Sequence, residues 1–263
     1  MGKLISSVMA SVFVVASASA AGAQEVPEKL IIGSSFSQTP WGFFDDNQQP
    51  TGIDVSMCGA LAKEMGASDV EYVNLDFKGL IPALQADRFN MVCAGVYITD
   101  EREKVVTMVP YVRSSQAILA KADSGIAGLE DLCGKGVSVL QGSAQLKVVA
   151  EQSEKCVAQS KPQVNIQSFD TQPIAVRALE NGNVEAFVAS DQLVSYYLLK
   201  NPSLEKAAAN INPVTLGIVI KKDDEALAKA VRDGLVRMKE NGAYDAVLKE
   251  WGIETAAVDS FDR

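Results

Sequence analysis

One arginine in a short polar turn has the most evident binding chemistry in this chain. Residues 75–102 begin with a helical pattern, pass through the apolar segment 89–94 and end at Arg102. An apolar segment of this length, followed by small residues, is typical of a buried strand that ends in a turn. The planar fork of donors on a guanidinium matches the two oxygens of a carboxylate, so Arg102 is a candidate carboxylate-binding residue. The simpler alternative is a surface ion pair with Glu101 or Glu103.

Residues 141–144, with the sequence Gln-Gly-Ser-Ala, form a second candidate anion site. They stand between a predicted strand and a predicted helix, so their backbone N–H groups would lie at a helix N-terminus. Unpaired N–H groups and the helix dipole favour a negative ligand there. Ser143 is also a common N-cap residue, and an ordinary cap is the simpler alternative. If the two candidates face each other, one carboxylate would contact both Arg102 and these amides.

Charge and composition narrow the classes of function. The net charge is −9, which argues against nucleic acid or an anionic membrane as a partner. The chain has no histidine, which removes a Ser-His-Asp triad and the usual proton shuttle. Its four cysteines are widely spaced, so we do not expect a metal site. We therefore expect no catalytic residues, no metal and no cofactor.

The N-terminus has the features of a cleavable secretory signal. Lys3 supplies a positive start, residues 4–16 form a short apolar run, and Ala-Gly-Ala at 21–23 is a small-x-small cleavage pattern. Residues 1–23 are therefore predicted to be removed, although cleavage after Ala20 also fits. The apolar run is too short for a membrane anchor, and no later segment is predicted to span a membrane. We expect an exported protein, located in the periplasm.

The four cysteines are expected to be paired if the protein reaches an oxidising compartment. Cys133 and Cys156 bracket a predicted strand, turn and helix, so a disulfide between them would close that unit. Cys58 lies in a predicted helix and Cys93 in a predicted strand. A disulfide would join that helix to its sheet, and two buried free thiols are the alternative.

Predicted strands and helices alternate along most of the chain. Apolar segments at 30–33, 70–73 and 89–94 are typical of strands, and residues 52–65 and 79–86 have helical patterns. Because a strand is followed by a helix and then by another strand, the order predicts an α/β protein with mostly parallel sheets.

Two extended stretches interrupt this alternation. Residues 116–120 follow no helix, and residues 214–220 come after the sequence Asn-Ile-Asn-Pro. Two α/β rounds of similar size joined by two such stretches suggest two lobes with two crossings. Ligands of such sheets bind beyond the carboxyl ends of the strands, in the crevice between units. The predicted lobes are residues 24–113 together with 213–263, and residues 114–212.

Several short motifs together resemble the bacterial extracellular solute-binding proteins of family 3. They cover nearly the whole mature chain in the order and spacing of that family. The most specific are Gly-Leu-Ile-Pro-Ala-Leu at 79–84 and Ile-Thr-Asp-Glu-Arg at 98–102; the others are Gly-Ile-Asp-Val at 52–55, Pro-Tyr at 110–111, Leu-Cys-Gly-Lys at 132–135, Val-Leu-Gln-Gly-Ser at 139–143 and Asn-Gly-Ala-Tyr at 241–244. The resemblance implies the two-lobed fold of type II periplasmic binding proteins, a Venus flytrap with two hinge crossings.

The resemblance also implies roles for single residues. Arg102 would hold the α-carboxylate of the ligand, and Asp191 at a strand end would accept from its α-ammonium. The carbonyl of Gly95 would accept from the same ammonium, and Tyr97 would contact the carboxylate or form a wall. The remaining predicted ligand-binding residues are the anion turn with Ser143 and Ala144, the apolar platform Phe77, and the first-loop residues Ser35, Gln38 and Trp41. Plain core packing is the alternative for Phe77 and Trp41.

The chain departs from the family's pattern in three places. Asn90 stands where an aspartate is usual, and Thr-Met-Val-Pro-Tyr at 107–111 replaces Phe-Ser-x-Pro-Tyr. The first loop, Ser-Ser-Phe-Ser-Gln at 34–38, has no acid, whereas binders of basic amino acids often carry one there. The last departure argues against a ligand with a cationic side chain.

The function implied by the resemblance is capture of an amino acid or related zwitterionic solute for an ABC transporter. The expected partners are that small ligand and a permease in the inner membrane, with the binding protein itself a monomer. Two alternatives remain open: a cyclohexadienyl or arogenate dehydratase on the same fold, which needs a cleft acid as general acid, and a ligand sensor for a membrane receptor.

Overall fold

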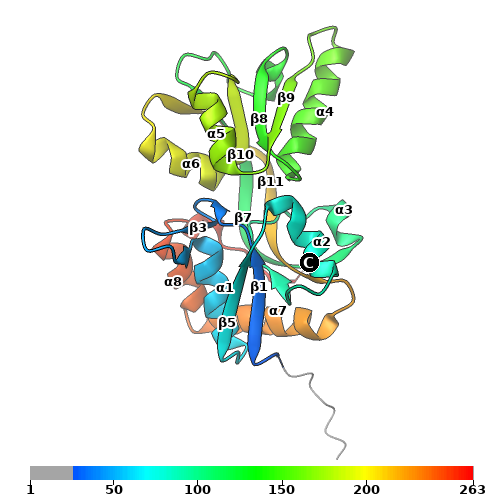
Figure 1. The fold of residues 1–263 in the computed structure, drawn as a ribbon, viewed down its shortest axis with the longest axis vertical. Helices are drawn as coiled ribbons and strands as arrows, with labels where there is room; N and C mark the ends of the chain where they lie inside the picture. The colour runs from blue at the N-terminus through cyan, green and yellow to red at the C-terminus, as the bar shows by residue number, and fades with distance from the viewer. Residues whose placement is uncertain (1–25, 263) are drawn as a thin grey trace, which may run out of the picture.

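The computed structural model describes residues 26–262. Figure 1 shows two lobes, one above the other, joined by two long strands that run between them. The predicted signal peptide, residues 1–23, lies outside the described residues. Both lobes share one eight-stranded sheet with the order β5-β1-β6-β11-β7-β10-β8-β9. The α/β class and the two-lobed architecture expected from the alternation are confirmed.

The first lobe contains parallel strands covered by helices. In Figure 1 it is the lower lobe, with α1, α7 and α8 on one side of the strands and α2 and α3 on the other. Strand β1 pairs in parallel with β5 on one edge and with β6 on the other. The elements are β1 (Lys29–Ser34), α1 (Ile53–Glu64), β5 (Asp69–Asn74), α2 (Leu80–Gln85), β6 (Met91–Val92), α3 (Asp100–Glu103), α7 (Glu225–Glu240) and α8 (Ala243–Glu250). A small separate sheet is formed by β2 (Ser37–Gln38), β3 (Gly42–Phe44) and β4 (Pro50–Thr51).

The second lobe repeats the same construction on a smaller scale. Strands β10, β8 and β9 pair in parallel, and β10 pairs in antiparallel with β7. Its strands are β8 (Gly136–Leu140), β9 (Asn165–Phe169) and β10 (Ala186–Ser190), and its helices are α4 (Ala144–Ala158), α5 (Gln172–Glu180) and α6 (Asp191–Lys200). Helices α4 and α6 begin at the serine N-caps Ser143 and Ser190, whose hydroxyls accept from backbone N–H groups of the first turn.

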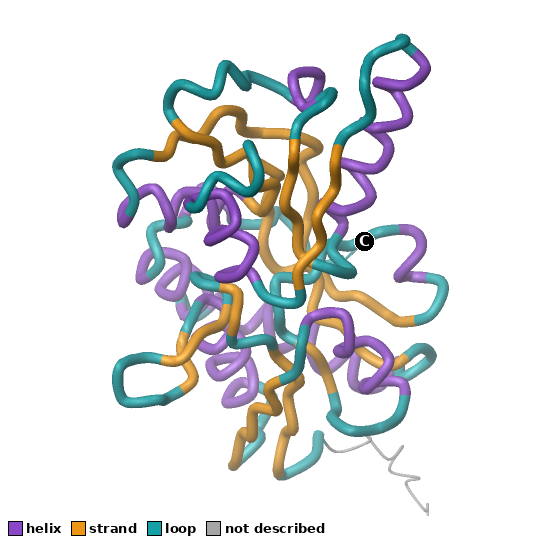
Figure 2. Tube along the Cα trace, turned by 45° about the horizontal axis from the view of Figure 1, so that its top comes forward, coloured by secondary structure: helices purple, strands orange, loops and turns teal. Residues whose placement is uncertain are grey.

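Two long antiparallel strands connect the lobes. Strands β7 (Val106–Lys121) and β11 (Leu204–Lys221) pair along most of their length, with four register shifts. Figure 1 shows β7 and β11 running between the lobes, and Figure 2 shows strands, in orange, in both lobes with helices around them. The expected strands at 116–120 and 214–220 are thus the ends of much longer ones. The residues Asn-Ile-Asn-Pro at 210–213, which are typical of a turn, lie inside β11. The strand is irregular there, because Asn210 and Asn212 have positive φ values of 54° and 45°.

Separate hydrophobic cores support the two lobes. In β7, Val109 and Val112 pack in the core of the first lobe, whereas Ala117 and Ile118 pack in cores of the second. In β11, Leu204 packs in the second lobe, while residues 216–220 pack in the first. Each connecting strand therefore leaves one core and enters another.

Both predicted disulfides are present. Cys58 in α1 is bonded to Cys93, which follows β6, with a Cα–Cα distance of 6.7 Å. Cys133 is bonded to Cys156 in α4, with a Cα–Cα distance of 5.6 Å. The free-thiol alternative for Cys58 and Cys93 is not found. Of the helices in residues 26–262, none has the length and apolar character needed to cross a membrane.

Candidate functional site

A pocket lies where the two lobes meet, and both lobes contribute to its lining. Its free volume is about 20 Å³, so the lobes lie closed on one another. The first lobe contributes Gln38, Trp41, Phe77, Gly95, Tyr97 and Arg102, and the second contributes Leu140, Ser143, Ala144, Gln145, Gln172 and Ser190. Most of the predicted ligand-binding residues are thus brought together in one place. A cluster of three or more potential metal ligands does not occur anywhere in residues 26–262.

Arg102 is the charged residue of this pocket. It lies in the short helix α3, where the Thr99 hydroxyl caps its backbone N–H at 3.3 Å. Its Nη1 donates to the carbonyl of Tyr97 at 2.7 Å, and its Nη2 donates across the cleft to the carbonyl of Gly142 at 3.2 Å. The guanidinium also lies 5.6 Å from the ring centre of Phe77, a cation–π contact. Arg102 therefore bridges the two lobes.

The hydrogen bonds of the Arg102 guanidinium within residues 26–262 go to main-chain carbonyls of both lobes. Glu101, one of its suggested surface partners, pairs with Lys147 of the other lobe. Burial lowers the pKa of Arg102 to about 10, with a smaller opposing effect from Glu101. The guanidinium stays protonated at neutral pH, so the pocket contains a partly buried cation that donates to neutral carbonyl oxygens. Such a group favours an anionic ligand.

Two aromatic residues of the first lobe form the walls. The Tyr97 ring is 4% exposed, and its hydroxyl donates to the carbonyl of Ser115 in β7 at 2.8 Å. Burial raises the pKa of Tyr97, so the side chain stays neutral. Trp41 is 2% exposed, and its Nε1 donates to Ser190 Oγ of the second lobe at 2.9 Å. Trp41 thus contacts both lobes, while Tyr97 ties the pocket wall to a connecting strand.

Gly95 is required by the close approach of Trp41. Its φ is +56°, and a Cβ at this position would lie 3.0 Å from Trp41 Cγ. A side chain here would be strained in its backbone and would press on the indole. The small-residue turn found in the sequence thus allows the tryptophan to pack against the strand end.

The predicted anion turn borders the pocket from the second lobe. Ser143 Oγ accepts from the N–H of Leu146 at 3.3 Å, so this serine is the N-cap of α4. Ala144 and Gln145 open the helix and also line the pocket. Their first-turn N–H groups have no intrahelical acceptor and lie at the positive end of the helix dipole. Ser143 therefore caps α4, and the N-terminus of the same helix borders the pocket.

Two glutamine amides in the pocket are buried and lack partners. Gln38 is 5% exposed and Gln172 is 6% exposed. Gln38 Nε2 and Gln172 Oε1 have no hydrogen-bond partner among the described residues. Because buried polar atoms are nearly always satisfied, an unpaired donor and an unpaired acceptor in one pocket indicate ligand-binding groups. Gln172 was missed in the sequence because the strand before it, β9, was not recognised there.

Asp191 and Ser35 do not line this pocket. Asp191 is the first residue of α6 and accepts from Lys206 Nζ at 2.8 Å, outside the pocket. Ser190, one position earlier, is the residue that faces the pocket. The ammonium role of Asp191 stays a prediction; its Oδ1 pairs with Lys206, and the side chain is partly exposed. Ser35 is 2% exposed, with its hydroxyl 3.3 Å from that of Ser37.

Ion pairs between the lobes surround the pocket. Lys78 of the first lobe donates to Asp170 at 2.7 Å and to Gln141 at 2.9 Å, both in the second lobe. A second ion pair joins Lys147 of the second lobe to Glu101 of the first lobe. All four ionic side chains are about half exposed, so solvent screens both pairs and their attraction is weak.

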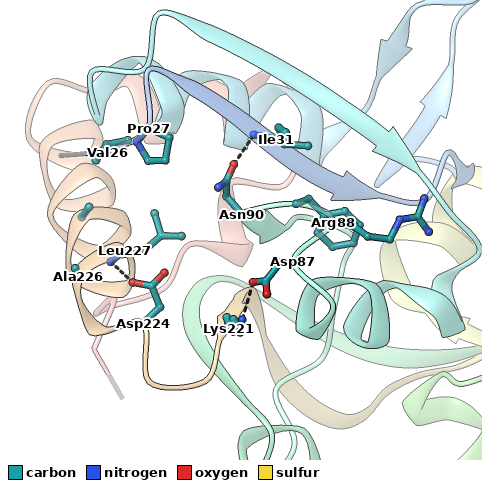
Figure 3. Close-up of a pocket in the computed structure, with 12 residues that line it drawn as sticks. Val26, Pro27, Ile31, Asp87, Arg88, Asn90, Lys221, Asp224, Ala226 and Leu227 are labelled. Carbon is teal, nitrogen blue, oxygen red and sulfur yellow. Dashed lines mark hydrogen bonds and ion pairs between the residues drawn. The ribbon is translucent and has the colours of Figure 1, made fainter. Parts of the chain in front are cut away.

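A second and larger cavity lies away from these residues, in the first lobe (Figure 3). Its volume is about 300 Å³, and it lies between the start of β1 and α7. Several of its polar groups are paired within the protein (Figure 3). Asn90 Oδ1 accepts from the N–H of Ile31 at 2.8 Å, and Lys221 pairs with Asp87 at 2.6 Å. Asn90, the departure noted in the sequence, thus has a structural role.

Comparison with known proteins identifies relatives of this chain. The sequence model of the bacterial extracellular solute-binding proteins, family 3, matches residues 30–254. ABC transporter arginine-binding protein 1 of Escherichia coli (strain K12) is 28% identical over 85% of this chain and 90% of its own length. L-cystine-binding protein TcyJ of the same strain is also 28% identical, over 84% of this chain and 82% of its own length.

The solved structures agree with the sequence relatives. An ancestral arginine-binding protein bound to glutamine superimposes with a TM-score of 0.80 at 33% identity, over 87% of this chain and all of the other. The ancestral amino acid-binding protein AncCDT-1, a precursor of cyclohexadienyl dehydratase, has a TM-score of 0.73 at 32% identity, over 85% of this chain and 95% of the other.

Proposed function

The chain belongs to the bacterial extracellular solute-binding proteins of family 3, and on that premise we propose that it captures an amino acid or related carboxylate-bearing solute between its lobes and delivers it to an ABC transporter. One observation carries the proposal. Arg102, a partly buried cation, donates to carbonyls of both lobes in the pocket between them.

The proposed binding step starts from the carboxylate of the solute. It would accept from the guanidinium of Arg102 in the first lobe and from first-turn N–H groups at Ala144 and Gln145 in the second. Charge-assisted bonds of this kind are strong in a closed pocket. Because the solute would contact both lobes only when they are closed, binding shifts the molecule toward the closed state.

Opening of the lobes is part of the proposal. A free volume of about 20 Å³ holds about one water molecule, so a solute of amino-acid size enters only if the lobes move apart. We infer that the movement is concentrated where β7 and β11 cross between the cores, at the predicted boundaries 113/114 and 212/213. The register shifts of β11 around Ile211 lie at this crossing and support that assignment.

The cellular setting and the partners belong to the same proposal. Two disulfides fit an oxidising compartment such as the periplasm. A permease of the inner membrane would receive the closed form, and we expect the binding protein to act as a monomer. The dehydratase alternative needs a carboxyl group poised as general acid. Among the described residues that line the pocket there is no aspartate or glutamate, so this alternative is not favoured.

Thermal unfolding of the mature protein with a panel of amino acids tests the proposal. A ligand at a thousandfold excess over its Kd stabilises a protein by about 4 kcal/mol. For a chain of this size, that corresponds to a rise in Tm of roughly 8–16 °C. A panel without any shift would count against the proposed function.

Arg102→Ala tests the carboxylate site itself. Removal of one partner of a buried charge pair costs about 2–5 kcal/mol, so Kd should rise at least about 30-fold. Arg88→Ala is the matched control, because Arg88 is an exposed arginine of the same lobe that lies outside this pocket. Equal affinities in the Arg102→Ala variant and the unmodified protein, measured by calorimetry, would remove the assignment.

A further inference from the structure

Two glutamine side chains meet the pocket from opposite lobes. Gln38 belongs to β2 of the first lobe, and Gln172 is the first residue of α5 in the second lobe. Strand β2 and helix α5 lie against each other across the cleft. Both side chains line the pocket, and the two residues are only 5% and 6% exposed. They therefore border one buried space, which closure of the lobes forms.

The amides of these two residues are unmatched. Gln38 Nε2 and Gln172 Oε1 have no hydrogen-bond partner among the described residues. Other polar side chains of the pocket do have partners within the protein. Gln145 forms a side-chain hydrogen bond with Tyr97, and the Ser190 hydroxyl accepts from an indole N–H at 2.9 Å. A buried donor and a buried acceptor without partners are costly, so a ligand group that satisfies both is favoured.

The two amides select for a group that can both donate and accept. A carboxamide or a ureido group between them can accept from Gln38 Nε2 and donate to Gln172 Oε1 at the same time. A carboxylate has no donor, and a guanidinium or an ammonium has no acceptor. Either of these charged groups leaves one amide atom unmatched unless that amide turns over. A hydrocarbon side chain leaves both unmatched.

The distribution of charge also favours a neutral group at this place. In the proposed binding step the ligand carboxylate pairs with Arg102, and Asp191 stays the predicted acceptor for the ammonium. The other residues that line the pocket have uncharged side chains. Asp170, two positions before Gln172, pairs with Lys78 at 2.7 Å and is 55% exposed. A charged side chain on the ligand would therefore be buried without a counter-ion of its own, which is unfavourable.

We propose that the ligand is an amino acid whose side chain ends in an uncharged carboxamide or ureido group, and that Gln38 and Gln172 select it. The inference rests on the proposed function, because it takes Arg102 as the site of the α-carboxylate. Gln38 donates to the carbonyl oxygen of the ligand side chain, and Gln172 accepts from its N–H. Because the two amides belong to different lobes, the same side-chain group also favours the closed state.

Matched amino acids test the selection by calorimetric titration of the mature protein. Asparagine with aspartate, glutamine with glutamate, and citrulline with arginine are pairs of similar shape and different charge, and methionine is an apolar counterpart of glutamine. In the pair that binds tightest, the neutral member should bind at least about tenfold tighter than its charged partner and than methionine. If a charged or an apolar amino acid binds tightest, the inference is overturned while the proposed function stands. If no amino acid of the full panel binds, both are overturned.

Gln172→Glu, with Gln163→Glu as its control, tests the amide of the second lobe. Glutamate has nearly the size of glutamine and is favourable in the first turn of a helix, so α5 should form, as checked by circular dichroism. The added carboxylate should shift the preference between citrulline and arginine at least about tenfold toward arginine. Gln163 is an exposed glutamine of the same lobe outside the pocket, and its replacement should leave the preference unchanged. An equal preference in the two variants would overturn the role of Gln172.

Gln38→Met tests the amide of the first lobe. Methionine has a similar length and no amide, so this variant should lose most of the preference for the neutral amide or ureido ligand over methionine. Gln85→Met is the control, because Gln85 is an exposed glutamine of the first lobe outside the pocket, and this variant should keep the preference. The same preference in Gln38→Met and the unmodified protein would overturn the role of Gln38.

Discussion

The buried carboxyl group of Asp54 should make the stability of this protein fall as pH rises through the neutral range. Asp54 lies in the first turn of α1 and has no exposed surface. One carboxyl oxygen accepts from the Tyr111 hydroxyl, and the other, Oδ2, has no hydrogen-bond partner among the described residues. Burial raises the pKa of Asp54 to about 7, and this effect is partly offset by Tyr111 and the Gly95 backbone.

The sign and size of the effect follow from linkage. The folded protein binds the Asp54 proton more tightly than the unfolded chain, whose pKa is near 3.8. The contribution of Asp54 to stability is therefore fully present below about pH 4, is lost progressively as pH rises, and is gone above about pH 7. The whole difference corresponds to about 4 kcal/mol, of which about 2–3 kcal/mol falls between pH 5 and pH 8.

Asp54→Asn isolates this contribution. The amide cannot ionise, so the variant should lack the fall of about 2–3 kcal/mol in unfolding free energy between pH 5 and pH 8. Urea unfolding at the two pH values measures it. The chain has no histidine, so few other side chains titrate in this range. Asp69→Asn is the control, because Asp69 is 62% exposed beside Lys29. Parallel pH dependence in Asp54→Asn and the unmodified protein would refute the reasoning.

Two further predictions concern the turn at the pocket and the disulfide of the second lobe. Gly95→Ala should cost about 1–3 kcal/mol in thermal unfolding and weaken ligand binding, because the new Cβ would press on Trp41 at a positive φ. Gly66→Ala, also at a positive φ but with open space around it, should keep its ligand affinity. Replacement of Cys133 and Cys156 by serine should lower the unfolding free energy by about 3 kcal/mol, the loop-closure value for a separation of 23 residues. An unchanged denaturation midpoint would contradict that value.

The sequence predicted the class of fold and most of the pocket because both depend on local patterns. Alternating apolar and helical segments identify the parallel strands, and the turn that contains Gly95 and Arg102 follows one of those strands directly. The role of Asp191 stays a prediction: β10 ends at Ser190, which lines the pocket, and Asp191 is the first residue of α6.

Other features depend on contacts between distant segments, so local patterns do not contain them. The bond between Trp41 and Ser190 joins residues 149 positions apart. Gln172 follows a strand whose apolar pattern is weak, since β9 has no fully buried residue. The long strand β11 contains Asn210 and Asn212 at positive φ, which in the sequence are typical of a turn. Each of these features needed the tertiary structure.

The contacts between the lobes are weak enough for a bound ligand to control closure. The pairs Lys78–Asp170 and Lys147–Glu101 are about half exposed, so water and salt screen both of them and each is weak. The hydrogen bonds from Trp41 and Arg102 across the cleft add about 1 kcal/mol each. Together the two hydrogen bonds contribute about 2 kcal/mol, at the lower end of the about 2–5 kcal/mol of a buried carboxylate pair on Arg102. Salt weakens the two exposed ion pairs between the lobes, whereas it changes the proposed carboxylate–Arg102 pair little. At high ionic strength, closure of the lobes should therefore depend more on the bound ligand.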